Sequence, residues 1–138
     1  MKQLLITIAA VVLVGCGSAP EKKLIGEWKG TDGTGKTMSL VFNEDGSMML
    51  IDGNTVFEAS EDIESVRWKL DTSQAPMHLD VVITSKSQEQ EPAILPLIAR
   101  FVGDNKLQVR LESSSNLKNR PLGFTTQKDN DQVVLVRQ

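Results

Sequence analysis

The sequence predicts an all-β domain, a small antiparallel up-and-down barrel of about eight strands. From residue 24 onward, apolar and polar residues alternate with a period of two, as in strands that bury one face. Turn-forming residues interrupt this pattern about every 8 to 12 positions, the spacing of short antiparallel strands. A barrel is favoured over a two-sheet sandwich, because closure removes the open edges of a long meander.

A signal peptide is predicted ahead of this domain, in residues 1–15. Lys2 gives it a positive start, and residues 4–14 form an apolar stretch. That stretch is shorter than the roughly 20 apolar residues that a membrane-spanning helix needs. It ends at Gly15, a small residue directly before Cys16, the single cysteine of the chain.

The tetrapeptide from Leu13 to Cys16 (LVGC) resembles the lipobox of bacterial lipoproteins. The resemblance implies that a diacylglycerol alkylates the Cys16 thiol, that the chain is cut before Cys16, and that the new amine is acylated. Two or more acyl chains hold a protein stably at a membrane. Since Gly17 rather than an aspartate follows the cysteine, the resemblance implies attachment to the outer membrane, on its periplasmic side. The alternatives are an ordinary secretory signal cut elsewhere and a plain buried thiol.

Residues 16–23 (CGSAPEKK) are small and polar, and they predict a flexible tether with a reach of about 15 to 17 Å. Residues 24–138 then form a single domain. Removal of residues 1–15 takes Lys2 from the 15 basic side chains and leaves the 18 acidic ones, a formal charge of −4. Aromatic residues make up only 4% of the chain and basic residues do not cluster, so nucleic acid is not an expected partner.

The first half of the domain predicts strands joined by tight turns. The Asp45-Gly46 pair between two alternating segments is a strong hairpin signal. Gly53 and Asn54 supply the next turn, and an acidic loop follows around Glu61. The strands are expected around Trp28 and at residues 38–42, 48–52 and 55–60.

The second half continues the same pattern with longer polar connections at residues 85–91 and 113–120. Pro96 lacks a backbone donor, so its strand needs a bulge or an edge position there. The strands are expected at residues 66–70, 77–83, 93–102, 107–111, 122–126 and 132–137.

Short motifs along residues 24–137 resemble those of a bacterial lipocalin-like domain family of unknown function. The opening Gly26-Glu27-Trp28 is similar to the Gly-x-Trp of lipocalin-like barrels, in which the tryptophan closes the bottom of the barrel. The other matches are WKLDTS at 68–73 with PMHLD at 76–80, DNKLQVRL at 104–111, Arg120-Pro121 with Phe124, and Arg137. The chain departs from the family pattern at Ala99, where an aromatic residue is common, and in having no tyrosine. The resemblance implies an architecture rather than an activity.

The resemblance also implies a structural site at the base of the barrel, formed by Gly26, Trp28 and Arg137. The guanidinium is expected over the indole face, a contact that contributes roughly 0.5 to 2 kcal/mol. The alternative is that Trp28 is an ordinary core aromatic residue.

The barrel interior is the candidate binding site for a small apolar ligand. Its methionines are flexible and suit an adaptable cavity. An eight-stranded barrel is just wide enough either to hold one small ligand or to be filled by its own side chains. Both remain open, with a filled or nearly filled interior slightly favoured and Trp68 expected to pack inside rather than to form a ligand platform. The candidate lining residues are Met38, Leu40, Phe42, Met48, Leu50, Trp68, Leu79 and Val81.

No catalytic residue, metal site or cofactor is predicted. His78 and Asp80 share one strand face, but no nucleophile or third ligand accompanies them, and both are expected to face water. The glycine-rich residues 32–36 lack the helix N-terminus of a phosphate site and indicate a hairpin loop. The spacing of a calcium loop is absent from the acidic residues Glu58, Glu61, Asp62 and Glu64.

The expected function is that of a non-catalytic binding module for a small apolar ligand, held at the membrane through acyl chains on Cys16. The alternative is a protein-interaction or inhibitor module with a filled barrel, whose partner the sequence does not name. In that case recognition falls to the loops around Asp32, Glu61, Glu89 and Asn116.

Overall fold

The computed structural model describes residues 19–111, 119–125 and 131–138. The predicted signal peptide, the Cys16 lipidation site and Asn116 therefore lie outside the described residues. One short helix and nine strands make up the described elements, which confirms the predicted all-β class. They are α1 Pro20–Leu24, β1 Gly26–Thr31, β2 Thr37–Phe42, β3 Met48–Asp52, β4 Thr55–Phe57, β5 Ile63–Asp71, β6 Met77–Ser85, β7 Ala93–Phe101, β8 Lys106–Leu111 and β9 Gln132–Arg137.

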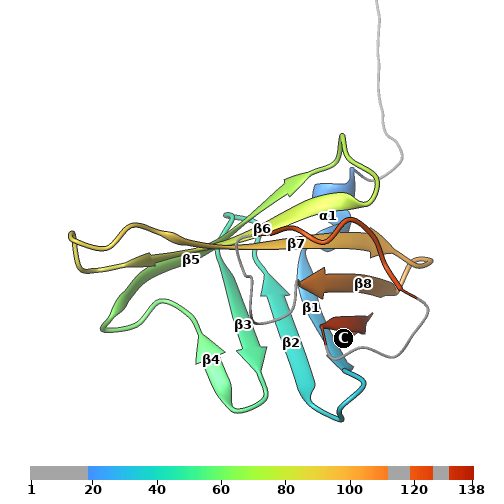
Figure 1. Ribbon diagram of the computed structural model, residues 1–138, viewed down its shortest axis with the longest axis horizontal. Coiled ribbons are helices and arrows are strands. Elements are labelled where there is room, and N and C mark those ends of the chain that lie inside the picture. The colour runs from blue at the N-terminus through green and yellow to red at the C-terminus, as the bar shows by residue number, and fades with distance from the viewer. Residues whose placement is uncertain (1–18, 112–118, 126–130) are drawn as a thin grey trace, which may run out of the picture.

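All nine strands belong to one antiparallel sheet, in the order β4-β3-β2-β1-β9-β8-β7-β6-β5. Consecutive strands are neighbours except for β4 and β5, and the last strand returns to the first, where Arg137 lies opposite Trp28. This return curls the sheet into a nearly closed up-and-down barrel. Figure 1 shows β7 and β8 crossing the direction of β2 and β3.

The ring closes through β3 and β5 rather than through β4. Ser47, directly before β3, forms an antiparallel bridge with Arg67 of β5, and the Trp68 N–H donates to the Gly46 carbonyl at 3.1 Å. A fully antiparallel ring needs an even number of strands, because strand directions must alternate around it. The three-residue strand β4 pairs with β3 beside this bridge, so eight strands complete the ring and β4 is additional. The prediction of about eight strands agrees with this arrangement.

Tight turns lie where the sequence predicts them. In the turn between β2 and β3, the Asn43 N–H donates to the Ser47 carbonyl at 2.9 Å, and Gly46 has a φ of +91°. In the turn between β3 and β4, Gly53 has a φ of +64°. Glycine suits both positions because it has no Cβ to oppose a positive φ.

The predicted strand at residues 122–126 is wrong for residues 122–125, which form no strand, and Thr126 lies outside the described residues. Pro121 and Gly123 weaken the strand tendency here. A side chain, rather than a neighbouring strand, bonds to the backbone of this segment: Arg110 Nη1 donates to the Gly123 carbonyl at 2.7 Å. Apolar and polar residues alternate here, but none of the described strands pairs with residues 122–125.

The predicted flexible tether is also too long, because residues 20–23 belong to α1. Pro20 lies in the first turn of the helix, where its fixed φ is favourable and its missing N–H is not needed. Leu24 at the other end is fully buried against the barrel. The helix therefore ends in the core rather than in solvent.

Pro96 lies within β7, opposite Asp80 of β6. Among the described residues, the pairs between β7 and β8 run from Phe101 with Leu107 to Leu97 with Leu111. The residue that would follow on the β8 side of Pro96 lies outside the described residues, so the expectation of a bulge or an edge position stays a prediction.

Alternate side chains of the strands, together with Leu24 of α1, form one apolar cluster inside the barrel. Burial of this cluster supplies the main stabilising free energy of the fold. Its buried members are Leu24, Trp28, Leu40, Phe42, Met48, Leu50, Val66, Leu79, Val81, Leu97, Ala99, Leu107, Val109, Val133 and Leu135.

Candidate functional site

Most of the predicted ligand-lining side chains are buried among one another. Leu40, Phe42 and Val81 are each 1% exposed and Leu79 is 0% exposed. An exposed fraction near zero means that protein atoms, rather than a water-sized space, surround the side chain. Met48 and Leu50 are buried as well, whereas Met38 and Trp68 are half-buried at the margin of the cluster.

Trp68 lies where β5 meets the turn between β2 and β3. Its ring packs edge-on against Phe42, with ring centroids 5.7 Å apart. Its Nε1 donates to the Asn43 carbonyl at 3.1 Å. Trp68 therefore packs inward as predicted, and it also links β5 to the end of β2 and to the turn between β2 and β3.

The base of the barrel contains the predicted pair of Trp28 and Arg137. The guanidinium carbon lies 4.2 Å from the centroid of the indole ring, in the cation–π geometry that the resemblance implies. Gly26 lies beside this pair with a φ of +130°, and a Cβ there would lie 3.1 Å from Arg137 Nη1. A side chain at position 26 would therefore strain the backbone and press on the guanidinium.

The same two side chains hold the end of α1. The Trp28 Nε1 donates to the Leu24 carbonyl at 2.8 Å. Arg137 donates to the Ile25 carbonyl at 3.0 Å and also to the Lys23 carbonyl. The last carbonyls of a helix have no partner within the helix. Here the barrel supplies those partners to three successive residues.

Lys23 adds a further contact between α1 and the barrel. Its Nζ donates to the Gly103 carbonyl at 3.2 Å and lies 4.6 Å from the centroid of the Phe101 ring. The helix and the turns that follow β2, β5 and β7 form what we call the closed end, with turn residues 43–47, 72–76 and 102–105.

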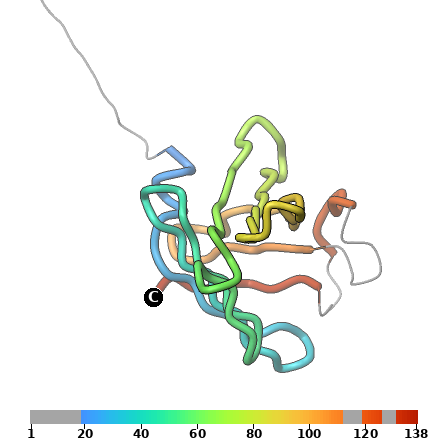
Figure 2. The backbone as a smooth tube through the Cα atoms, turned by 90° about the vertical axis from the view of Figure 1, so that its left-hand side faces the viewer, coloured from blue at the N-terminus to red at the C-terminus, as the bar shows by residue number. Residues whose placement is uncertain are grey.

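The opposite strand ends carry what we call the loop end, comprising residues 32–36, 53–54, 58–62 and 86–92. Two backbone bonds tie parts of this end together: Gly53 N–H donates to the carbonyl of Thr37, the first residue of β2, at 2.9 Å, and Lys86 N–H donates to the Asp62 carbonyl at 3.1 Å. The predicted recognition loops around Asp32, Glu61 and Glu89 thus lie at the same strand ends. Figure 2 shows the turn 32–36 on the side of the molecule away from α1.

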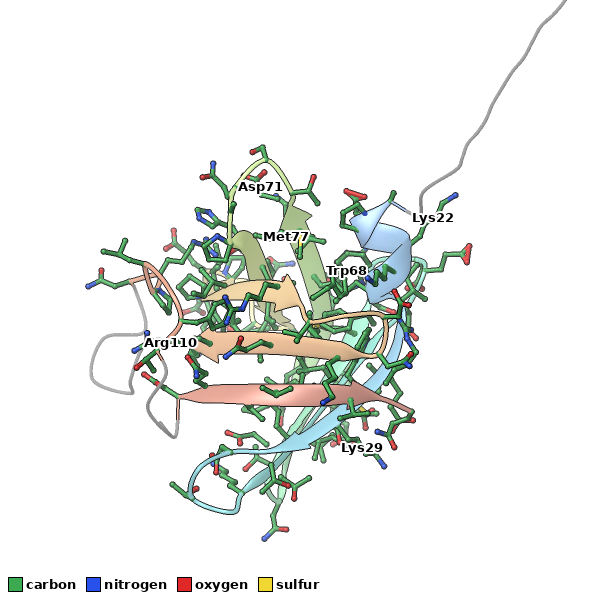
Figure 3. All side chains as sticks on the ribbon, turned by 90° about the vertical axis from the view of Figure 1, so that its right-hand side faces the viewer. Lys22, Lys29, Trp68, Asp71, Met77 and Arg110 are labelled. Atoms are coloured by element: carbon green, nitrogen blue, oxygen red, sulfur yellow. The ribbon has the colours of Figure 1, made fainter. Side chains whose placement is uncertain are left out.

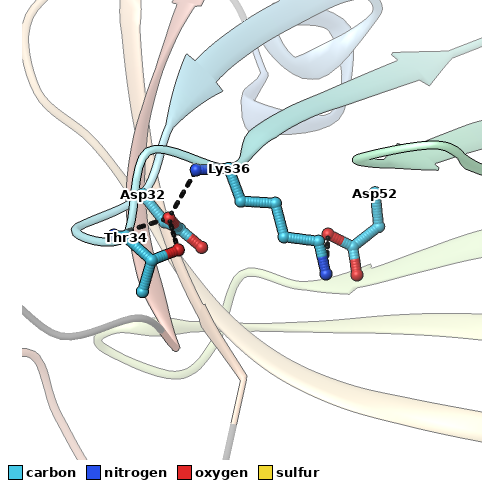
Figure 4. A network of polar contacts seen from close by, with 4 residues as sticks. All are labelled: Asp32, Thr34, Lys36 and Asp52. Atoms are coloured by element: carbon cyan, nitrogen blue, oxygen red, sulfur yellow. Dashed lines mark hydrogen bonds and ion pairs between the residues drawn. The ribbon is translucent and has the colours of Figure 1, made fainter.

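The loop at residues 32–36 is closed by its own aspartate. Asp32 Oδ1 accepts from the Thr34 hydroxyl at 2.6 Å, the Thr34 N–H at 2.8 Å and the Lys36 N–H at 3.0 Å (Figure 4). Lys36 Nζ lies 3.1 Å from Asp52 of the next turn (Figure 4). These bonds, above all that from the Thr34 hydroxyl, hold the pKa of Asp32 below its usual value. The loop is a self-bonded hairpin turn, in agreement with the prediction.

Two turns at the closed end repeat this arrangement. Asp45 Oδ1 accepts from the Ser47 hydroxyl at 2.6 Å and the Ser47 N–H at 2.9 Å. Asp71 Oδ1 accepts from the Ser73 hydroxyl at 2.6 Å and the Ser73 N–H at 3.0 Å. In each case the serine hydroxyl is the main cause that lowers the pKa of the aspartate. An aspartate two residues before a serine or threonine is thus the common turn device of this chain.

Residues 119–125, which the sequence predicted as the end of a polar connection followed by a strand, lie on the outer face of β6, β7 and β8 instead. Arg120 Nη2 donates to Asp80 at 2.6 Å, and its Nη1 donates to the Leu97 carbonyl at 2.8 Å. The Arg100 guanidinium carbon lies 4.5 Å from the centroid of the Phe124 ring. These contacts hold the outer segment, residues 119–125, against the barrel wall. In the sequence, only the Arg-Pro-x-x-Phe motif marked this segment. A motif does not show which residues its side chains contact, so the packing on the barrel wall was not predicted.

His78 and Asp80 lie on the outer face of β6, as the sequence predicts, but neither side chain is fully in water. Both are half-buried, and Arg120 covers Asp80. Among residues 19–111, 119–125 and 131–138, no group of three or more His, Cys, Asp or Glu side chains is placed to hold a metal ion.

In the part of the chain that the structure describes, no helix is long and apolar enough to cross a membrane. Comparison with known proteins yields no matching family model, no matching curated protein and no matching solved structure.

Proposed function

We propose that this protein is a lipid-anchored, non-catalytic interaction module of the cell envelope, with a filled barrel as scaffold and the loop end as binding surface. The burial of the predicted ligand-lining side chains carries this proposal. Leu40, Phe42, Leu79 and Val81 have almost no exposed surface to offer a ligand. The anchor is proposed on the lipobox resemblance around Cys16, and the lipocalin-like resemblance supports the architecture.

The loop end has the properties of a recognition surface. It collects several segments that are far apart in the chain, held by the backbone bonds of Gly53 and Lys86. Loops carried by a rigid barrel are common positions for binding residues. The acidic side chains here favour a protein partner with basic groups, since complementary charge steers and selects partners. The exposed acidic residues are Glu58, Glu61, Asp62, Glu89 and Glu91.

The test is capture of partners by the lipidated protein in intact cells with a mild crosslinker. We expect a protein that is captured by the wild type to be lost when Glu61→Lys and Asp62→Lys reverse the charge of the loop. Glu21→Lys, an exposed reversal on α1 at the closed end, is the matched control. Identical captured proteins for all three chains would contradict binding at the loop end.

A small apolar ligand is the second candidate, favoured by one observation. Half-buried apolar side chains Phe57, Ile63, Ile83 and Leu95 lie at the loop end of the core cluster, where β4 and β5 are not paired. Extraction of the natively purified protein with organic solvent, followed by mass spectrometry, separates the two proposals. A stoichiometric released molecule supports the ligand carrier, and an empty extract supports the filled scaffold.

A further inference from the structure

We infer that the barrel is held on the bilayer in one orientation, with the closed end towards the lipid and the loop end away from it. This inference rests on the proposed lipidation of Cys16. It adds a second interaction surface, the closed end, whose partner is the lipid surface itself. Figures 1 and 2 show α1 and the turn 72–76 on one side of the molecule and the turn 32–36 on the opposite side.

The first step is that α1 is fixed to the barrel. The carbonyls of Lys23, Leu24 and Ile25 all accept bonds from Trp28 or Arg137. Leu24 is 0% exposed, so the helix end is also buried in the core. Any force applied at the start of α1 therefore acts on the barrel as a whole.

The second step is that little chain remains between the lipid and this fixed helix. Only three residue steps separate Cys16 from Ala19, where the described structure begins. Fully extended, they span about 10 Å. This is shorter than the reach of about 15 to 17 Å expected for a tether that is flexible through residue 23.

The third step is the height of the two ends. Strand β1 runs six residues from the closed end to the loop end. At about 3.3 Å per residue and the usual tilt of barrel strands, the loop end lies about 15 to 20 Å further from the anchor. The short tether thus keeps the closed end at the lipid and presents the loop end to the aqueous compartment.

Three side chains mark the surface that should face the lipid. Lys22 is exposed on α1, and Figure 3 shows it on the same side of the molecule as Asp71, which begins the turn between β5 and β6. Gln74 is exposed in that turn, and Val102 is 45% exposed in the turn held by Lys23. The exposed charges of this end are mixed, with Lys22 and Lys106 beside Glu21, Glu44, Asp45, Asp71 and Asp104, so the inference rests on the short tether and the fixed helix rather than on charge.

The test uses two variants of the lipidated protein in phospholipid vesicles, one with a fluorophore at the closed end and one with a fluorophore at the loop end. Cys16 is consumed by lipid, so Gln74→Cys at the closed end and Asn54→Cys at the loop end each provide a single thiol. With nitroxide-labelled lipid headgroups in the vesicle, we expect several-fold stronger quenching at position 74 than at position 54. Equal quenching, or stronger quenching at position 54, would overturn the inference.

Two further variants identify the cause of the orientation. A flexible Gly/Ser insertion between Ser18 and Ala19 should reduce the difference between the two positions while leaving the fold intact. Arg137→Lys, which loses the paired guanidinium bonds to the Ile25 and Lys23 carbonyls, should also reduce the difference in quenching, in a protein that still folds. A difference unaffected by the insertion would show that the tether does not set the orientation. Failure of the protein to float with the vesicles would instead refute the proposed anchor, on which the inference depends.

Discussion

At the scale of single residues, Trp28 and Arg137 act both at the base of the barrel and at the end of α1. The guanidinium lies over the indole, and both side chains bind carbonyls at the end of α1. The sequence motif predicted the pairing of the two residues. It did not predict the carbonyl contacts, because a five-residue helix has little stability of its own and leaves little trace in a sequence.

Replacement of Arg137 tests this part of the structure. Arg137→Gln removes the cation–π contact and charged donors to two carbonyls, so we expect a loss of roughly 2 to 4 kcal/mol in the free energy of unfolding. Urea unfolding followed by tryptophan fluorescence measures it. Lys29→Gln, which removes only an exposed ion pair with Glu27, should cost less than about 1 kcal/mol. Equal losses for the two variants would show that Arg137 does not hold α1.

Trp68 illustrates what alternation of residues leaves undetermined. The period of two placed its side chain on the inner face, and the structure agrees. Its contacts with Phe42 and Asn43 depend on the pairing of β5 with a distant turn. That pairing is absent from the local pattern, so the role of Trp68 in closing the ring was not predicted.

At the scale of elements, the hairpin turns share one polar device. Asp32, Asp45 and Asp71 each bond to a hydroxyl and an N–H two residues later. The sequence predicted the turns around Asp32 and Asp45 from their glycines, whereas the turn after Asp71 followed from its place between the predicted strands 66–70 and 77–83. The strand predicted at residues 122–126 was wrong for 122–125, because alternation alone does not make a strand and none of the described strands pairs with these residues.

The turn aspartates make stability depend on pH in acid. Their pKa values are lowered in the folded protein, so their contribution is complete above their ordinary pKa of 3.8 and is lost as the pH falls through the lowered values. We expect the free energy of unfolding to fall more steeply from about pH 4 downward in the wild type than in a variant with all three aspartates changed to asparagine. Urea titrations at several pH values measure both slopes. Parallel curves would contradict this role.

The outer segment gives a prediction about coupling. Arg120 bonds to both Asp80 and the Leu97 carbonyl, so Arg120→Gln should destabilise more than Asp80→Asn. A double-mutant cycle of the two should give a coupling free energy of about 1 kcal/mol, since the pair is partly shielded from water. The more exposed pair of Lys36 and Asp52 is the reference and should couple less. A vanishing coupling for Arg120 and Asp80 would show that this contact does not hold the segment.

At the scale of the whole molecule, the proposal of a filled barrel rests on the near-complete burial of its core side chains. Leu79 is completely buried, so Leu79→Ala should lower the free energy of unfolding by about 2 to 5 kcal/mol. Leu122→Ala, at a side chain 98% exposed, should change it by less than about 0.5 kcal/mol. Thermal or urea unfolding compares the two. A small effect at Leu79 would indicate a loosely packed interior.

The barrel class was predictable from the sequence, but its closure was not. Alternation and turn spacing indicated an antiparallel meander whose edges must pair. The bridge of Ser47 with Arg67, which leaves β4 as an additional strand, depends on strand directions around the complete ring. Whether a ring of this size holds a cavity also depends on how bulky side chains meet across it. Neither property is contained in any local window of residues.

Native mass spectrometry of the protein extracted from membranes in mild detergent tests the central proposal, a lipid-anchored barrel with a filled interior. We predict a chain that begins at Cys16, carries covalent acyl groups and has the same mass before and after denaturation. A chain that retains residues 1–15 or lacks acyl groups would contradict the anchor. A stoichiometric molecule released on denaturation would contradict the filled interior.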